Sequence, residues 1–176
     1  MTSDANVTGR LPWWTTAAEP DWDAVYAEQL PRIYNYFRYR LGNEHAAEDL
    51  TSRTFEKAWR ARHRYRRDLA GFATWLLRIA RNVATDHFRT AHQHAPLEDA
   101  VDVPADGTPE DEAVLRSNFA RLSALVAGLP ERDRELLALK YGAGATNRAI
   151  AEVTGLSESN IGTILHRSVQ TLRAQW

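Results

Sequence analysis

Residues 72–89 read FATWLLRIARNVATDHFR and carry apolar side chains at near-helical spacing, at Phe72, Leu76, Ile79, Val83 and Phe88. The opposite side of this predicted helix holds mostly polar residues: Arg78, Arg81, Asn82, Asp86 and Arg89. Just upstream, residues 57–67 (KAWRARHRYRR) contain six Lys or Arg and two aromatic residues. The polar side is therefore either a solvated face or a surface that binds an anionic partner.

The charge of the chain is strongly partitioned. The formal net charge of all 176 residues is −1, but residues 53–94 contain ten Lys or Arg and three acids, and residues 95–115 contain seven acids and no Lys or Arg. A local basic block of this size is typical of a nucleic-acid-binding surface. The chain has no cysteine, which excludes disulfides and thiolate metal sites and fits a reducing compartment. Because the chain also lacks an apolar run of about 18 residues, we expect a cytoplasmic protein without membrane insertion.

Helical spacing nearly throughout the chain predicts an all-α fold. A first helix is expected over 22–41, where Pro31 should kink or divide it and Gly42 should end it. Asn43 is the expected N-cap of a second helix, whose Leu50, Phe55, Ala58 and Trp59 should face inward.

Residues 93–112 contain three prolines and seven acids, which predicts a flexible acidic linker. We therefore expect two small helical domains, at 22–92 and 113–176, after an N-terminal extension at 1–21. The role of Trp13 and Trp14 in this extension stays open.

Residues 146–168 (TNRAIAEVTGLSESNIGTILHRS) predict two helices joined by a tight turn. Thr146 and Ser157 are the expected N-caps and Gly155 supplies the turn, because positive φ is accessible to glycine. The spacing of three residues is typical of a DNA-binding helix-turn-helix: the small Ala151, then Gly155, then the β-branched Ile161. The predicted outward side chains that can bond to bases or phosphates are Ser157, Ser159, Asn160, Thr163, His166 and Arg167. A helical hairpin that packs on another part of the protein is the alternative.

Three blocks of the chain resemble the bacterial extracytoplasmic-function (ECF) sigma factors, which are initiation factors of RNA polymerase. They are AEDLTSRTFEKAW (47–59), residues 72–89, and LPERDRELLALKY (129–141) followed by the helix-turn-helix. The resemblance implies that the second helix docks on core RNA polymerase through Glu48, Asp49, Leu50, Arg53 and Lys57. It implies that residues 157–168 read the −35 promoter element, and that an anti-sigma factor is a further partner.

The resemblance also implies that residues 60–71 and the outer face of the following helix bind and melt the −10 element. Cations that screen phosphates and rings that stack on unpaired bases suit this task. The residues expected to contact DNA here are Arg60, Arg62, Arg64, Tyr65, Arg66, Arg67, Arg78, Arg81, Asn82 and Arg89.

Simpler structural roles are expected for several of these residues. Trp59, Phe72 and Trp75 should belong to the core, Asp86 should pair with a neighbouring Arg, and Asn82 could cap or brace a loop. The acids Glu131, Asp133 and Glu135 predict an exposed helix face. Gly162 and Ile164 replace basic residues that are frequent in the family, which predicts weaker −35 binding.

Other function classes have less support in the sequence. His87, His92 and His94 have no carboxylate or thiol at a spacing that would complete a metal site, so we expect no metal and no cofactor. A catalytic triad or glycine-rich phosphate loop is not evident, so an enzyme is not expected. The alternative function is a stand-alone helix-turn-helix regulator whose N-terminal half senses a ligand or dimerises.

Overall fold

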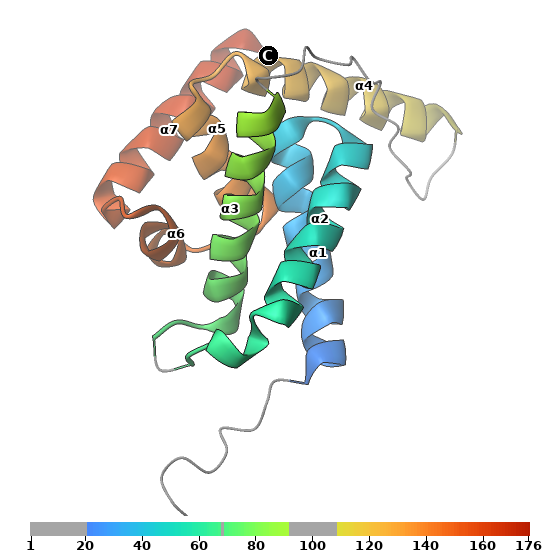
Figure 1. The fold of residues 1–176 in the computed structure, drawn as a ribbon. Helices are drawn as coiled ribbons and strands as arrows, with labels where there is room; N and C mark the ends of the chain where they lie inside the picture. Colours follow the sequence, from blue (N-terminus) through green and yellow to red (C-terminus); the bar gives the residue numbers. More distant parts are fainter. Residues whose placement is uncertain (1–20, 68, 92–108) are drawn as a thin grey trace, which may run out of the picture.

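The computed structural model describes residues 21–67, 69–91 and 109–176, and the regular elements in these ranges are all helical (Figure 1). The predicted all-α fold is confirmed. Most of the predicted N-terminal extension and linker lies outside the described residues, as do Trp13, Trp14, His92 and His94. Among the described helices, none is both long and apolar enough to cross a membrane.

The N-terminal half consists of α1 (Trp22–Leu41), α2 (Glu44–Arg60), the short 3₁₀ helix η1 (Arg62–Arg64) and α3 (Phe72–Ala91). Gly42 ends α1 with a φ of 68°, and the Asn43 side chain accepts a hydrogen bond from the Ala46 N–H at 2.7 Å. These two predictions are confirmed. Pro31 does not divide α1. Proline has no N–H group, so the carbonyl of Ala27 receives no hydrogen bond from position 31. Both residues lie on the exposed side of the helix, where water can bond to this carbonyl.

The C-terminal half contains α4 (Pro109–Ala127), α5 (Glu131–Leu137), the π-helical turn η2 (Ala138–Gly142), α6 (Asn147–Thr154) and α7 (Glu158–Gln175). Thr146 Oγ1 accepts a hydrogen bond from the Ala149 N–H at 3.1 Å, and Ser157 Oγ accepts one from the Asn160 N–H at 3.3 Å. Gly155 has a φ of 79°. The predicted helix-turn-helix is therefore present, with its caps and its turn at the expected residues.

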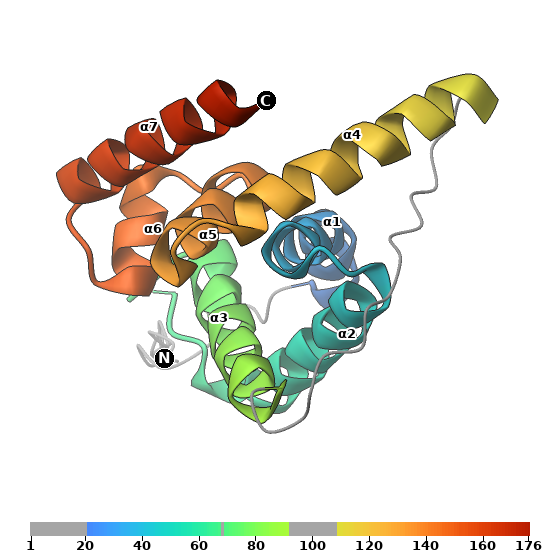
Figure 2. The same ribbon diagram turned by 90° about the horizontal axis from the view of Figure 1, so that it is seen from above.

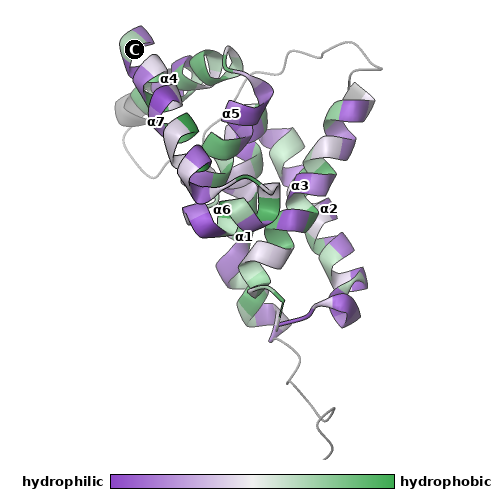
Figure 3. Ribbon diagram, turned by 90° about the vertical axis from the view of Figure 1, so that its left-hand side faces the viewer, coloured by the Kyte–Doolittle hydropathy of each residue, from purple (hydrophilic) through white to green (hydrophobic). Residues whose placement is uncertain are grey.

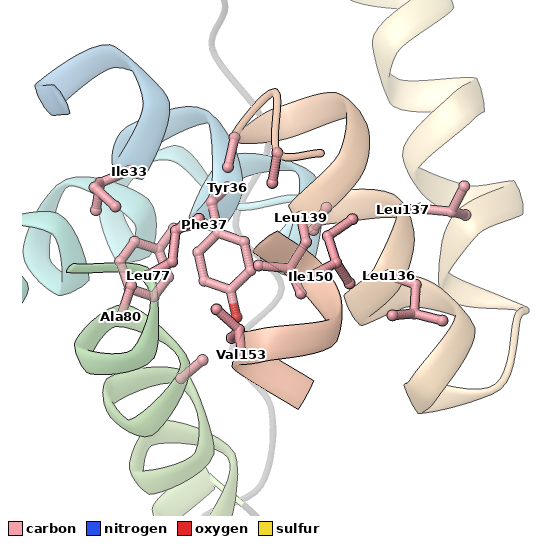
Figure 4. Close-up of a cluster of buried hydrophobic side chains, with 14 of the residues drawn as sticks. Ile33, Tyr36, Phe37, Leu77, Ala80, Leu136, Leu137, Leu139, Ile150 and Val153 are labelled. Atoms are coloured by element: carbon pink, nitrogen blue, oxygen red, sulfur yellow. The ribbon is translucent and has the colours of Figure 1, made fainter. Parts of the chain in front are cut away.

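The two halves pack against each other through one continuous core (Figures 2 and 4). The π-helical turn η2 lies against α1, and α6 lies against α3. In Figure 3 the hydrophobic residues concentrate where α1, α3 and α6 meet. Fully buried side chains of this core come from both halves, and the large apolar ones are Ile33, Tyr36, Phe37, Leu50, Leu76, Leu136, Leu139, Ile150 and Ile161.

Gly142 allows η2 to approach the backbone of α1 closely. A Cβ atom at this position would lie only 2.7 Å from the carbonyl oxygen of Asn35 in α1. A side chain larger than hydrogen would therefore push η2 away from α1. The signal for this contact in the sequence is the run of small residues GAGA at 142–145.

Candidate nucleic-acid interface

An exposed aromatic ring lies at the α2–α3 corner, which we define as residues 59–71. Trp59 is 49% exposed, and the Arg62 guanidinium carbon lies 4.2 Å from the centre of its ring. The edge of the Trp22 ring supports Trp59 from the protein side, at a centroid distance of 5.3 Å. The expectation that Trp59 faces the core is wrong, because the core face of α2 is completed by its neighbour Ala58.

Three further rings brace this corner from inside. Tyr65 lies 5.2 Å from both Phe72 and Trp75, and these two rings lie 5.3 Å from each other. Phe72 and Trp75 are partly buried and pack on the core, as expected. Tyr65 therefore supports the loop and is less free to stack on a base than Trp59 is.

The cations of the corner face solvent. Arg60, Arg64, Arg66 and Arg67 are exposed, and Arg60 pairs with Glu56 at 2.5 Å across an exposed turn of α2. Because an exposed ion pair contributes at most about 1 kcal/mol, the Arg60 guanidinium remains available to another anion. The corner thus joins one exposed ring to several exposed positive charges.

The polar side of α3 is less open than the sequence predicted. The Arg81 guanidinium donates to both carboxylate oxygens of Glu135, with Nε at 3.0 Å from Oε1 and Nη2 at 3.4 Å from Oε2. Arg78 Nη2 donates to the carbonyl oxygen of Glu152 at 3.0 Å. The expectation of a continuous DNA-facing stripe therefore needs correction, because the C-terminal half engages these two cations.

The remainder of this face is accessible. Asn82 and Arg89 are exposed, and Arg89 pairs with Asp86 at 3.2 Å, as predicted for Asp86. Lys57 of α2 also reaches Asp86, at 3.3 Å.

The outward face of α7 matches the prediction. All six side chains named for it (Ser157, Ser159, Asn160, Thr163, His166 and Arg167) are exposed. Ile164, however, is only 3% exposed and packs inward with Ile161 and Leu165. Ile164 therefore does not replace a basic residue at the surface, and this part of the argument for weak −35 binding is wrong.

Of the three acids of α5 that were predicted to form an exposed face, Glu131 is exposed, but Asp133 and Glu135 are buried, contrary to the prediction. Asp133 is 3% and Glu135 8% exposed. Asp133 accepts hydrogen bonds from Arg132 Nη2 at 3.0 Å and from the buried Ser168 hydroxyl at 3.1 Å, and Arg167 Nη2 lies 3.6 Å away. Asp133 thus connects α5 to α7, a role that sequence reasoning missed.

The exposed side of α2 carries most of the residues predicted to dock on polymerase. Glu48, Asp49, Arg53 and Lys57 are exposed, and Arg53 pairs with Asp49 at 3.0 Å. Leu50 is 1% exposed and belongs to the core, so its assignment to a docking surface is wrong.

Beside this surface, an open groove of about 340 Å³ lies between α1 and α2, lined by Leu30, Pro31, Tyr34, Glu48, Thr51 and Ser52. The Tyr34 hydroxyl donates to Glu44 Oε1 at 3.0 Å, and burial together with this hydrogen bond raises the pKa of Tyr34 to about 12. Within the described ranges, no group of three His, Cys, Asp or Glu side chains is placed to hold a metal ion.

The chain matches two family models and several characterised relatives. Residues 25–94 match Sigma-70 region 2, and residues 119–172 match Sigma-70, region 4. The ECF RNA polymerase sigma factor BldN of Streptomyces coelicolor is 32% identical over 153 residues, which cover 84% of this chain and 57% of BldN. The ECF RNA polymerase sigma factor ShbA of Streptomyces griseus is 30% identical over 172 residues, which cover 90% of each chain.

A solved structure shows the same arrangement of helices. The sigma factor RpoE in its complex with the anti-sigma factor NepR, from Bartonella quintana, aligns with a TM-score of 0.73 at 19% identity, over 88% of this chain and 95% of that one. These matches do not favour a stand-alone regulator. The chain belongs to the ECF RNA polymerase sigma factors.

Proposed function

We propose that this sigma factor joins core RNA polymerase through the exposed side of α2 and directs it to promoters through two DNA-binding surfaces. The first is the α2–α3 corner together with the outer face of α3, which binds and melts the −10 element. The second is the outward face of α7, which reads the −35 element. The observation that carries the proposal is the half-exposed Trp59 ring among exposed arginines, in a chain that also holds a fully capped helix-turn-helix.

The α2–α3 corner suits separated strands better than duplex DNA. An unpaired base can stack on an aromatic face, and such stacking contributes about 1–3 kcal/mol per base. Trp59 offers this face, and Arg62 already lies over it at 4.2 Å, so a base can replace the guanidinium or stack above it. Arg64, Arg66 and Arg67 lie close by in sequence to neutralise the phosphates of the same strand.

The outward face of α7 suits the major groove of duplex DNA. Short hydroxyl and amide side chains at Ser157, Ser159, Asn160 and Thr163 can bond to base edges. Arg167 adds a cation at the far end of this face, where Asp133 lies 3.6 Å from its guanidinium. We assign the protein to the cytoplasm, with core polymerase, promoter DNA and an anti-sigma factor as partners and with no catalytic step of its own.

Reconstitution with core polymerase tests this proposal. The purified chain should co-elute with core enzyme and support run-off transcription from its own promoter. Trp59→Ala should reduce strand opening while retaining core binding. Trp176→Ala is the matched control, because Trp176 is 51% exposed and has Arg121 4.7 Å above its ring, but lies at the end of α7.

Two results would contradict the proposal. One is a chain that never co-elutes with core polymerase. The other is tight, specific binding to duplex operator DNA without polymerase, together with no effect on transcription initiation, which would favour the stand-alone regulator.

A further inference from the structure

A strip of aromatic rings runs along the line where α1 and α2 lie side by side (Figure 1). Trp22 of α1 meets Trp59 of α2 at a centroid distance of 5.3 Å, and Tyr26 meets Phe55 at 4.7 Å. Tyr26 is 48% and Trp59 is 49% exposed, so the strip faces solvent. A contiguous exposed apolar surface of this kind is typical of an interaction site.

The strip continues into the groove between α1 and α2. Leu30 and Tyr34 follow Tyr26 at intervals of four residues, which places all three on the same side of α1. Thr51 and Ser52 line the groove from α2. The groove encloses about 340 Å³, near the lower end of the range for ligand pockets, which is about 300–1,000 Å³. It therefore suits one or two bulky side chains better than a whole helix.

The charge at the groove is negative. Glu48 is the one charged residue that lines it, and this residue is exposed. The Tyr34 hydroxyl also donates to Glu44 Oε1 at 3.0 Å, which holds a second carboxylate beside the groove. Because carboxylates repel the phosphates of nucleic acid, the groove suits an apolar partner that carries a cation.

Residues 10–14 of this chain, RLPWW, have this chemistry. The segment lies outside the described residues and precedes α1 in the sequence. It contains four apolar residues in succession, and Arg10 is the one Lys or Arg among residues 1–20. The segment therefore matches the strip and the groove in both apolar character and charge.

The chain between this segment and α1 is long enough to reach the groove. Trp14 precedes Trp22 by eight residues, which span up to about 26 Å when extended. Leu30 and Tyr34 lie about 12 Å and about 18 Å from Trp22 along the axis of α1, at about 1.5 Å per residue. So short a connection gives the segment an effective concentration on the order of millimolar at the groove, which favours it over partners in solution.

We propose that residues 10–14 dock on the groove between α1 and α2 of the same chain. The tryptophan pair covers the exposed ring of Tyr26 and enters the groove, which buries apolar surface. Arg10 lies further from α1 in the sequence than the tryptophans do, so it reaches Glu48, at the end of the groove remote from Trp59. The inference does not rest on the proposed function, because neither DNA nor polymerase takes part in the docking.

Fluorine NMR of the full-length protein labelled with 5-fluorotryptophan tests the docking. The chain has six tryptophans, and Trp13→Phe and Trp14→Phe assign the two resonances of the segment. Both resonances should differ from those of the free peptide RLPWW. Glu48→Lys, which repels Arg10, and Ser52→Phe, which fills the groove with a ring, should move both resonances toward the peptide values.

The matched controls change the other side of α2. Glu56→Lys makes the same change of charge and Arg53→Phe introduces the same ring, but both residues line the groove between α2 and α3. The two resonances of the segment should be the same in these controls as in the wild type. Trp75 packs on the core, so an unchanged Trp75 resonance shows that a variant is folded.

Disulfide formation gives a second measurement. Because the chain has no cysteine, Thr15→Cys can be combined with Ser52→Cys at the proposed docking site or with Thr90→Cys at the groove between α2 and α3. A disulfide needs two Cα atoms within about 7 Å of each other. The pair at positions 15 and 52 should therefore be oxidised at least about tenfold faster than the pair at 15 and 90, since docking raises the effective concentration of the first pair alone.

Several results would overturn the proposal. One is a wild-type protein whose Trp13 and Trp14 resonances equal those of the peptide, and another is a pair of shifted resonances that Glu48→Lys and Ser52→Phe leave unchanged. Equal rates of disulfide formation would also overturn it. Shifts that grow with protein concentration would assign the groove to a second copy of the chain, and shifts that arise only after addition of core polymerase would assign it to polymerase.

Discussion

Replacement of Asp133 tests how α5 is connected to α7 within the C-terminal half. The Asp133 carboxylate is 3% exposed and accepts a hydrogen bond from Ser168 of α7, which is 2% exposed. A hydrogen bond to a charged acceptor contributes about 1.5–3 kcal/mol. Asp133 also lies in the first turn of α5, where the helix dipole favours a negative charge by about 0.3–1 kcal/mol.

The other partners of Asp133 add little. The Arg132 side chain is 52% exposed, so its ion pair contributes at most about 1 kcal/mol. The Arg167 side chain is 63% exposed and 3.6 Å away, which gives a still smaller contribution. Removal of the carboxylate relieves its own desolvation, and alanine favours the helix by about 0.5 kcal/mol. The net loss for Asp133→Ala is therefore about 2–3 kcal/mol of unfolding free energy.

Urea unfolding followed by tryptophan fluorescence measures this loss. Asp133→Asn should be milder, about 1–2 kcal/mol, because the amide oxygen still accepts from Ser168. Ser168→Ala should cost about 1 kcal/mol, since the carboxylate keeps its arginine partners. The double variant Asp133→Ala, Ser168→Ala should cost less than the sum of the single variants, because the two groups contact each other. An Asp133→Ala protein within about 0.5 kcal/mol of the wild type would refute this reasoning.

Three further predictions concern DNA binding and pH. The double variant Arg64→Ala, Arg66→Ala should bind core polymerase as the wild type does but open the promoter less. Permanganate reactivity of the polymerase complex measures this opening, and unchanged opening would contradict the role of the α2–α3 corner. Arg167→Ala should weaken −35 binding by about 1–3 kcal/mol if Arg167 contacts a base. If Arg167 contacts a phosphate instead, the variant should lower the slope of log K against log salt concentration by about 1. A variant with the affinity and the slope of the wild type would contradict both roles. The pKa of Tyr34 is raised from 10 to about 12 in the folded protein, so the stability that its neutral form provides is complete below pH 10 and decreases as the pH rises toward 12. The urea midpoint of the Tyr34→Phe variant should therefore decrease less than that of the wild type between pH 10 and 12. A pH profile identical to that of the wild type would contradict the role of Tyr34.

Local features of the fold were predictable because their causes lie within a few residues. The caps at Asn43, Thr146 and Ser157 each bond to an N–H three residues later, and Gly155 supplies a conformation that a turn requires. The helix over residues 72–89 was equally predictable from its apolar spacing, and α3 spans Phe72–Ala91.

Features that depend on distant partners were not predictable in this way. Asp133 meets Ser168 across 35 residues, and Arg40 meets Glu131 across 91, so the acids of α5 resembled an ordinary solvated face. The burial of Leu50 and Ile164, in contrast, was predictable from the spacing of apolar residues along their helices. Leu50 lies three residues after the buried Ala47, and Ile164 lies three residues after the buried Ile161, which places each on the core face of its helix.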